Sequence, residues 1–514
     1  MTNFFLGVDI GTYSSKGVLV REDGALIANH VVPHELAMPR PGWYEHDAED
    51  TWWHDFVTIT RSLLTQSNVD ATDIAGVGVS SISPAVVPLD DAGRALRPAI
   101  LYGIDTRATQ EIAEIEHALG GAEAVFRRYA MALSSQAAAP KLRWIRNHEP
   151  AVWHATRLIL SGTGYIVWRL TGEATIDHYD VGAYAPLYDP DTLDWEPAFA
   201  ELIAPPAWMA RPTWTCTIAG HIHGSGAAAS GLAAGTPVIT GTADAAAEAI
   251  SAGLAAVGDM MIMYGSSIFF IARTDHRPAS THFWGARFLE PETYVLAGGM
   301  STAGSLTRWF RDTLGQPELA AETAGGDNAY AALATLAASA PPGANGVIAL
   351  PYFAGERTPL HDPNARGLFI GLTLSTTRAD LYRALLESVA YGIRHNLDAM
   401  RSEGVKAQRI LAVGGGTLNG PWMQLVSDVV GVQQLIPAQQ IGAAYGDAML
   451  AAVGVGFFDS IAAAAGSWVR PGRVVTPDRT CFERYQPYYD LYRDLYIQTA
   501  PTMHALSRML ADGN

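Results

Sequence analysis

The chain has 514 residues, more than one hydrophobic core normally serves, so we expect two or three domains. Hydrophobic residues make up 49% and charged residues 17%, which excludes intrinsic disorder, and the formal net charge of −17 disfavours nonspecific binding to nucleic acid or to an anionic membrane. The two cysteines, Cys216 and Cys481, lie far apart and match no metal-ligand spacing, which excludes a disulfide scaffold.

The first predicted element is a β-hairpin near the N-terminus. An apolar strand, 4–8, leads to Asp9, a turn rich in Gly, Thr and Ser follows, and a second apolar strand, 17–20, leaves the turn. Glycine lets the backbone come close to a ligand, and unpaired N–H groups and hydroxyls are anion donors. Asp9 would repel a bare phosphate, so it fits there only with a cation such as Mg²⁺ in between. The alternative is an ordinary hairpin with a polar turn.

The rest of the chain alternates between strand and helix patterns, which predicts an α/β fold. The second half opens at Asp259 in the same way as the first, with a strand, a Gly265-Ser266-Ser267 turn and another strand. We therefore expect duplicated α/β domains that face each other across a cleft. The alanine- and glycine-rich stretch 225–236 is interpreted as a loop, and 320–343 as a small-residue helix that stops at Pro341-Pro342-Gly343. The predicted strands are 75–79, 158–160, 237–240, 260–264, 268–273, 347–350 and 410–413, and the predicted helices are 378–400 and 421–430.

The segment 239–254, ITGTADAAAEAISAGL, joins a strand to a strongly helical run of alanines, with Asp244 at the junction. Asp is an excellent helix N-cap, which is one interpretation of this residue. The other is a general base that accepts the proton of an attacking hydroxyl. One side chain does not easily serve both roles, because a cap engages an oxygen that a base must keep free.

Three glycines in the segment 411–424, LAVGGGTLNGPWMQ, follow a strand and precede a helix. They permit a flat surface without side chains, against which a purine can lie. The spacing is not the dinucleotide-binding fingerprint, and the chain has no G-x-x-x-x-G-K-[ST] loop, so a P-loop enzyme is disfavoured. The alternative is a tight strand-to-helix turn.

Taken together and in order, these segments resemble the FGGY carbohydrate kinases over essentially the full chain, with features of the xylulokinase-like branch. The matching segments are GVDIGTYSSK, GTADAAAEA, YGSS, PYFAGERTPLHDPNARGLFIGL, YRALLESVAYGIRHNLDAM, GGGTLNGPWMQ and GAAYGDAMLA. Each match alone is weak, but a full set in family order is specific.

The resemblance implies an α/β protein with two actin-like (ribonuclease H-like) ATPase domains facing across a cleft that binds ATP and Mg²⁺. It implies an N-terminal domain over 1–252, a C-terminal domain over 253–490 and a terminal helix or tail over 491–514. Asp244 would be the catalytic base, and Asp9 and Asp244 would hold the metal. The residues expected around the nucleotide are Gly11, Thr12, Ser15, Lys16, Gly265, Ser266, Gly304, Gly415, Gly416 and Asn419.

The substrate side matches the family less well. Xylulokinases usually carry a Gln-Met-His trio after the strand at 76–80, and this chain has Ser81-Ile82-Ser83-Pro84 there. In LYGIDTRAT, Asp105 and Arg107 resemble the family's Asp-x-Arg pair, which would shape the sugar site beside Tyr102. Ser83, Tyr102, Asp105 and Asp244 are therefore the expected substrate residues. Without this trio the sequence does not determine which sugar binds, because lost hydrogen-bond partners can change specificity by orders of magnitude.

The predicted activity is ATP-dependent phosphorylation of a small sugar or polyol, such as the ketopentose xylulose or a related tetrose or pentose. The alternatives are an ATPase or chaperone of the same superfamily, and a non-catalytic sugar sensor. We expect a small-molecule sugar or polyol as partner, no nucleic acid and no membrane, and base rates favour a homodimer. No apolar run has the length of a membrane span and no leader pattern is recognised, so the expected location is cytoplasmic.

Overall fold

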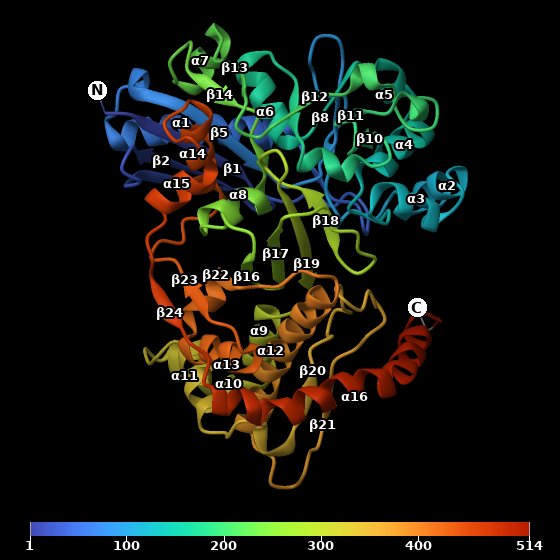
Figure 1. Ribbon diagram of the computed structural model, residues 1–514, viewed down its shortest axis with the longest axis vertical. Coiled ribbons are helices and arrows are strands. Elements are labelled where there is room, and N and C mark those ends of the chain that lie inside the picture. The colour runs from blue at the N-terminus through green and yellow to red at the C-terminus, as the bar shows by residue number, and fades with distance from the viewer. Residues whose placement is uncertain (1, 513–514) are drawn as a thin grey trace.

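Each half of the chain folds around a seven-stranded mixed sheet in the computed structural model, which describes residues 2–512. The two halves form an N-terminal and a C-terminal lobe, stacked along the long axis of the molecule (Figure 1). In spatial order the N-terminal sheet contains β13 (Ile218–His221), β14 (Pro237–Ile239), β5 (Ile74–Ser81), β1 (Phe4–Ile10), β2 (Ser14–Arg21) and β3 (Leu26–Pro33), with β15 (Thr242–Ala243) also paired to β5. The C-terminal sheet contains β18 (Trp284–Arg287), β19 (Tyr294–Met300), β17 (Ile268–Thr274), β16 (Asp259–Tyr264), β22 (Arg409–Val413), β23 (Gln434–Ile436) and β24 (Arg473–Val475).

The two sheets share one topology, which confirms the expected duplication. In the first, β1 pairs antiparallel with β2 and parallel with β5. In the second, β16 pairs antiparallel with β17 and parallel with β22. Each hairpin therefore places its turn at the end of the central strand of its own sheet, where open α/β sheets bind ligands.

Helices pack on both sheets, and others lie around them. In the N-terminal half they are α1 (His54–Ser67), α2 (Thr109–Ala118), α3 (Ala122–Tyr129), α4 (Ala138–His148), α5 (Pro150–Ala155), α6 (Gly162–Thr171), α7 (Gly224–Ser230) and α8 (Asp244–Ser251). In the C-terminal half they are α9 (Gly304–Leu314), α10 (Gln316–Thr323), α11 (Ala329–Ala338), α12 (Arg378–Ser402), α13 (Gly420–Val430), α14 (Ala443–Gly454), α15 (Ile461–Trp468) and α16 (Arg479–Asp512). Short two-stranded pairs complete the fold: β4 (Glu45–His46) with β7 (Ala99–Ile100), β6 (Val87–Leu89) with β8 (Leu158–Leu160), β9 (Thr175–Asp177) with β12 (Arg211–Thr213), β10 (Tyr188–Asp189) with β11 (Asp194–Trp195), and β20 (Ile348–Leu350) with β21 (Leu368–Ile370).

Helix α14 comes late in the chain but packs against the N-terminal sheet. A Cβ on Gly7 of β1 would lie 1.9 Å from the Ala444 carbonyl oxygen, and one on Gly78 of β5 would lie 2.2 Å from the Asp447 carbonyl oxygen. Because only glycine lets a helix approach a sheet this closely, these residues bring α14 directly against the middle of β1 and β5. The hydrophobic cluster around α14 also includes residues of both sheets, among them Val18 and Met261, so the lobes share part of their core.

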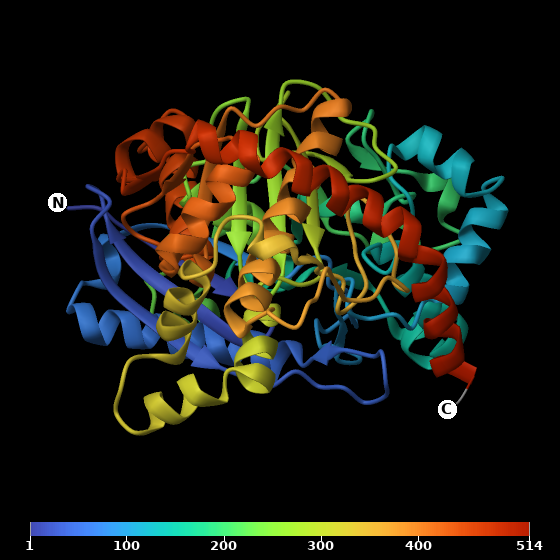
Figure 2. The same cartoon turned by 90° about the horizontal axis from the view of Figure 1, so that it is seen from below.

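The predicted elements differ from the structure in three places. The stretch 225–236 contains helix α7 and is not all loop. The stretch 320–343 contains the end of α10 and the whole of α11, separated by Gly325-Gly326, where Gly325 has φ +87°. Helix α16 crosses the full width of the C-terminal lobe (Figures 1 and 2) and continues through residue 490, the expected start of a separate tail. Within residues 2–512, no helix has the length and apolar character needed to cross a membrane.

Candidate active site

The first hairpin places Asp9 and Lys16 side by side. They are register partners in the β1–β2 pair, and the register neighbour of Asp9 on the other side is Ser80 of β5. At the tip of this hairpin, the amides of Thr12 and Tyr13 have no acceptor within the described chain. Two unpaired N–H groups next to a lysine form a site suited to phosphate oxygens.

Ser15 lies on the opposite face of β2 from Lys16. It is fully buried against α1, where its hydroxyl donates to Asp55 Oδ2 at 2.7 Å. Adjacent strand residues point to opposite faces, so Ser15 and Lys16 cannot both face the hairpin's ligand side. Lys16 therefore lies on the face of Asp9, its register partner, and Ser15 lies on the opposite face.

Asp244 is the first residue of α8, and Ala243 occupies the N-cap position. The Asp244 carboxylate accepts one hydrogen bond, from the adjacent Ala245 amide at 2.7 Å, so it does not close the first turn as an N-cap would. Burial raises the pKa of Asp244 to about 8, and the charge of Asp9 adds to the rise. The negative charges of Asp9 and Asp244 therefore repel each other, and Asp244 keeps an oxygen available for a ligand.

Two further carboxylates adjoin this pair, Glu248 and Asp447. Glu248 lies one turn after Asp244 on α8, and burial raises its pKa to about 7, with Asp9 adding to the rise and Lys16 opposing it. Asp447 of α14 is fully buried, accepts from Ser80 Oγ at 2.7 Å and leaves its second oxygen without a partner. Burial also raises the pKa of Asp9 to about 6, while Lys16 opposes the rise.

The donor set around Asp9 fits a magnesium ion that is held mainly through phosphate. Within residues 2–512 there is no group of three or more His, Cys, Asp or Glu side chains placed to bind a metal directly. Mg²⁺ usually takes one or two carboxylates and completes its shell with water and phosphate oxygens, so such a group is not required. The Ser80 hydroxyl lies 3.3 Å from Asp9, but it has a single proton and lies closer to Asp447, at 2.7 Å. Among the described residues the Asp9 carboxylate therefore keeps lone pairs for a cation.

The second turn, 265–267, is fixed to the start of α9. The amides of Ala303 and Ser305 donate to the Ser266 carbonyl at 2.9 and 3.0 Å, and the Gly304 amide donates to Gly265 at 3.0 Å. A Cβ on Gly304 would lie 2.6 Å from the Gly265 oxygen, so this contact needs glycine. The structure thus brings Gly265, Ser266 and Gly304 together, as expected for a second phosphate-binding turn.

The glycine-rich turn after β22 offers open space on one side. A Cβ on Gly415 would meet no atom within 4 Å, whereas one on Gly416 would lie 2.8 Å from the Tyr264 side chain. Asn419 accepts from the Trp422 amide at 3.1 Å and so caps α13. Gly415 therefore faces open space, while Gly416 and Asn419 have structural partners.

Tyr102 contacts the tip of the first hairpin. Its hydroxyl lies 3.1 Å from Thr12 Oγ1. Burial raises the pKa of Tyr102, and the nearby charges of Asp244 and Arg357 also act on it, in opposite directions. Arg357 donates to the carbonyls of Ile268 and Met300 at 3.1 and 2.8 Å. Tyr102 is thus within electrostatic range of the predicted base.

The remaining expected substrate residues have protein partners. Ser83 donates to the buried Asp180, which itself raises the pKa of Asp244. Asp105 is 1% exposed, pairs with Arg107 at 2.7 Å and accepts from the Tyr44 amide at 2.7 Å, so it holds the 101–107 loop in place. Among described contacts, the structure does not bring Asp105 to the Asp9–Asp244 pair.

Sequence reasoning did not single out Glu248, Asp180 or Asp447. Glu248 could have been found from the sequence, because its i, i+4 spacing from Asp244 places it on the same face of α8. Asp447 lies in the GAAYGDAMLA segment and Asp180 in a segment without a motif. Their proximity to the site follows from the packing of α14 and of the 175–184 segment, which no local pattern predicts.

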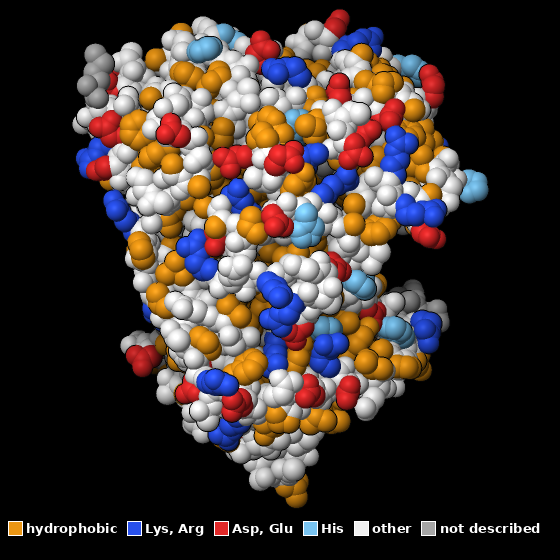
Figure 3. All heavy atoms as spheres, viewed as in Figure 1, with side chains coloured by type: hydrophobic (Ala, Val, Ile, Leu, Met, Phe, Trp, Pro, Cys, Tyr) orange, Lys and Arg blue, Asp and Glu red, His pale blue; other side chains and the backbone are white. Residues whose placement is uncertain are grey.

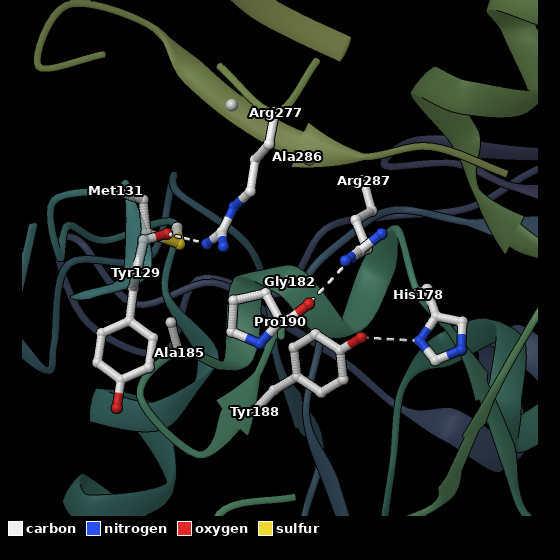
Figure 4. Close-up of a pocket in the computed structure, with 11 residues that line it drawn as sticks. Tyr129, Met131, His178, Gly182, Ala185, Tyr188, Pro190, Arg277, Ala286 and Arg287 are labelled. Carbon is white, nitrogen blue, oxygen red and sulfur yellow. Dashed lines mark hydrogen bonds between the residues drawn. The ribbon is translucent and has the colours of Figure 1, made fainter. Parts of the chain in front are cut away.

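A small cavity lies where the lobes meet, away from this pair (Figure 4). Arg277 and Arg287 reach across it from the C-terminal half, and donate to the carbonyls of Tyr129 at 2.9 Å and Pro190 at 3.0 Å. Its volume of about 30 Å³ holds a water molecule or so and not a sugar. The molecule is also hollowed on one side between the lobes (Figure 3).

Comparisons with known proteins match both halves of the chain. The family model described as "FGGY family of carbohydrate kinases, N-terminal domain" matches residues 4–251, and the corresponding C-terminal domain model matches residues 260–455. Xylulose kinase of Bacillus subtilis is 27% identical, with 98% of each chain covered, and glycerol kinase of Halalkalibacterium halodurans is 30% identical, with 90% of this chain and 93% of the relative covered. The crystal structure of xylulose kinase from Rhodospirillum rubrum superimposes with a TM-score of 0.89 at 34% identity, covering 98% of this chain and 100% of that one.

Proposed function

Since the chain belongs to the FGGY family of carbohydrate kinases and is a sugar kinase, we propose that it transfers the γ-phosphoryl group of ATP to a hydroxyl of a ketopentose such as xylulose or of a related sugar or polyol. In this proposal Asp244 is the general base and Asp9 holds Mg²⁺. The observation that carries it is the carboxylate of Asp244, which has an oxygen free of protein partners and a pKa raised to about 8 by burial and by Asp9.

The residues supply positioning and charge balance, which phosphoryl transfer needs most. Asp244 accepts the proton of the sugar hydroxyl. The oxygen of that hydroxyl forms the new bond to the γ-phosphorus, and the bond between this phosphorus and the ADP oxygen breaks. Lys16 and the free amides of Thr12 and Tyr13 would hold phosphate oxygens in place. When bound at Asp9, Mg²⁺ would neutralise charge on the phosphates.

Support for the sugar class comes from the relatives, and the pocket residues leave its identity open. The relatives include xylulose kinases and a glycerol kinase, so ketoses and polyols both belong in the set of candidates. The usual Gln-Met-His trio is replaced, and Ser83 at this place donates to Asp180. A pocket with altered hydrogen-bond partners is expected to discriminate strongly among sugars.

The test is ADP release from MgATP with a panel of ketoses, aldoses and polyols. We expect one compound, or a small related group, to stimulate release far above the rate without sugar. Phosphorus NMR of the product would then identify the phosphorylated hydroxyl. Release of ADP that no compound on the panel stimulates would contradict the proposed activity and favour a superfamily ATPase.

A further inference from the structure

Two histidines lie beneath the first hairpin, and each faces a carbonyl of its tip. His34, directly after β3, places Nε2 3.1 Å from the Gly11 carbonyl oxygen. His46 of β4 places Nε2 3.1 Å from the Thr12 carbonyl oxygen. The two rings meet edge to face with centroids 4.9 Å apart. Side chains from two other segments therefore hold the backbone whose amides are expected to bind phosphate.

The contacts of His46 define it as a neutral ring. Its Nδ1 accepts the indole N–H of Trp52 at 3.1 Å, so the proton must reside on Nε2, where it is donated to Thr12. Burial lowers the pKa of His46 to about 4, and the neighbouring His34 adds to the fall. His46 is therefore a fixed, uncharged donor.

The contacts of His34 define a different protonation state. Its Nδ1 lies 2.7 Å from Asp55 Oδ2, and its Nε2 faces the Gly11 carbonyl. The Gly11 carbonyl is an acceptor, and so is Asp55 as an ionised carboxylate, so with Asp55 ionised both bonds form only if both ring nitrogens carry a proton. The side chains of His34 and Asp55 are 8% and 4% exposed, so water offers few alternative partners.

We infer that His34 is an imidazolium cation that positions the phosphate-binding hairpin by joining the Gly11 carbonyl to the buried carboxylate of Asp55. It is a positioning residue, because it acts through Gly11 and touches no ligand. Asp55 completes the arrangement, since it also accepts the Ser15 hydroxyl from the neighbouring strand at 2.7 Å. The inference that this hairpin binds phosphate rests on the proposed function, whereas the charge of His34 does not.

The direct test is ¹⁵N NMR of the imidazole nitrogens in ligand-free protein labelled at histidine. At about pH 7.5 an ordinary histidine is mostly neutral. We expect a signal pair of the doubly protonated form that is assigned to His34 by its loss in His34→Gln, or by its shift in His46→Gln if the first variant does not fold. A singly protonated His34 would overturn the inference.

The positioning role is tested by the dissociation constant for MgADP, measured by calorimetry. We expect His34→Gln to weaken binding about tenfold or more, because one bond to Gly11 or Asp55 is lost, and His46→Gln to weaken it as well. The control is His30→Gln, on β3 itself, where the side chain lies near Gln66 and away from the tip of the hairpin. This variant should bind as the wild type does.

The outcomes separate this inference from the proposed function. A folded His34→Gln variant that binds MgADP with unchanged affinity would overturn the positioning role. A wild-type protein that does not bind MgADP at all would contradict the proposed function, while the charge of His34 is still decided in the ligand-free protein.

Discussion

Ser80 places its hydroxyl between Asp9 and Asp447, 3.3 Å from one carboxylate and 2.7 Å from the other. Asp9 ends the central strand of the N-terminal sheet, and Asp447 comes from α14, more than four hundred residues later in the chain. Through this contact α14 packs against the strands that carry Asp9 and Ser80. One oxygen of Asp447 accepts this hydroxyl and its other oxygen is buried without a partner in the described chain, whereas Asp9 lies farther from the hydroxyl and keeps oxygens for a ligand.

Asp244→Asn should remove most of the turnover and leave the fold intact. The amide cannot accept a proton, and a general base is worth about 10² to 10⁴ in rate. Sugar-dependent ADP release measures the loss, and calorimetry should show MgADP binding close to that of the wild type. Asp91→Asn, at an exposed carboxylate outside the site, is the matched control and should keep full activity. A folded Asp244→Asn variant with normal turnover would remove this residue from its role.

Asp9→Asn should raise the Mg²⁺ concentration needed for half-maximal activity by about tenfold or more, because one charged ligand is lost. The matched control is Asp91→Asn, at an exposed carboxylate outside the site, which should keep the wild-type magnesium requirement. Titration of Mg²⁺ against activity compares the three proteins. Equal magnesium requirements in the wild type and Asp9→Asn would assign the metal to other groups.

Gly415→Leu should block nucleotide binding without destabilising the protein. A side chain at this position enters open space in the ligand-free structure, and the proposal places adenosine there. We expect the MgADP dissociation constant to rise on the order of a hundredfold, with an unchanged melting temperature. Gly466→Leu also enters open space, on α15, and should bind MgADP normally. Normal MgADP binding by Gly415→Leu would show that adenosine does not bind beside Gly415.

Glu356→Gln should increase stability at neutral pH and lose this advantage in acid. Burial raises the pKa of Glu356 from 4.5 to about 7, so the folded protein holds a proton that the unfolded chain releases. The wild type therefore loses stability as pH rises from about 4.5 to 7, by about 3 kcal/mol in total. Glutamine still accepts from the Ser301 amide, which Glu356 accepts at 2.8 Å, and it has no charge to bury.

Urea unfolding at about pH 5.5 and pH 8 measures this effect, and the variant's advantage should grow by about 2 kcal/mol between them. Glu35→Gln, at an exposed position, should show no such change. An advantage that is constant with pH would mean that Glu356 is charged in the folded protein throughout.

The strands and helices around the site follow from the sequence, because their apolar periodicity is strong. The predicted helix 378–400 corresponds to α12, which spans Arg378–Ser402, and both hairpins occur where the Gly/Ser turns predict them. The orientation of the Ser15 side chain could also be predicted from the sequence. Adjacent residues on a strand face opposite ways, so Lys16 beside Asp9 already implies that Ser15 faces α1.

Other parts of the site depend on tertiary packing that no local pattern encodes. Asp105 and Arg107 carry a family pattern, yet they pair with each other at 2.7 Å. Asp447 reaches Ser80 only because Gly7 and Gly78 let α14 approach the sheet. His34 looked like one of fifteen scattered histidines, and only its two acceptors give it a defined state.

The most direct test of the account is a crystal structure with Mg²⁺, a non-hydrolysable ATP analogue and the sugar identified by the panel. We expect Mg²⁺ at about 2.1 Å from an Asp9 oxygen or joined to it through one water, and the reacting hydroxyl within about 2.6–3.2 Å of the Asp244 carboxylate. A sugar bound away from Asp244, or a nucleotide whose phosphates lie far from both hairpin turns, would contradict it.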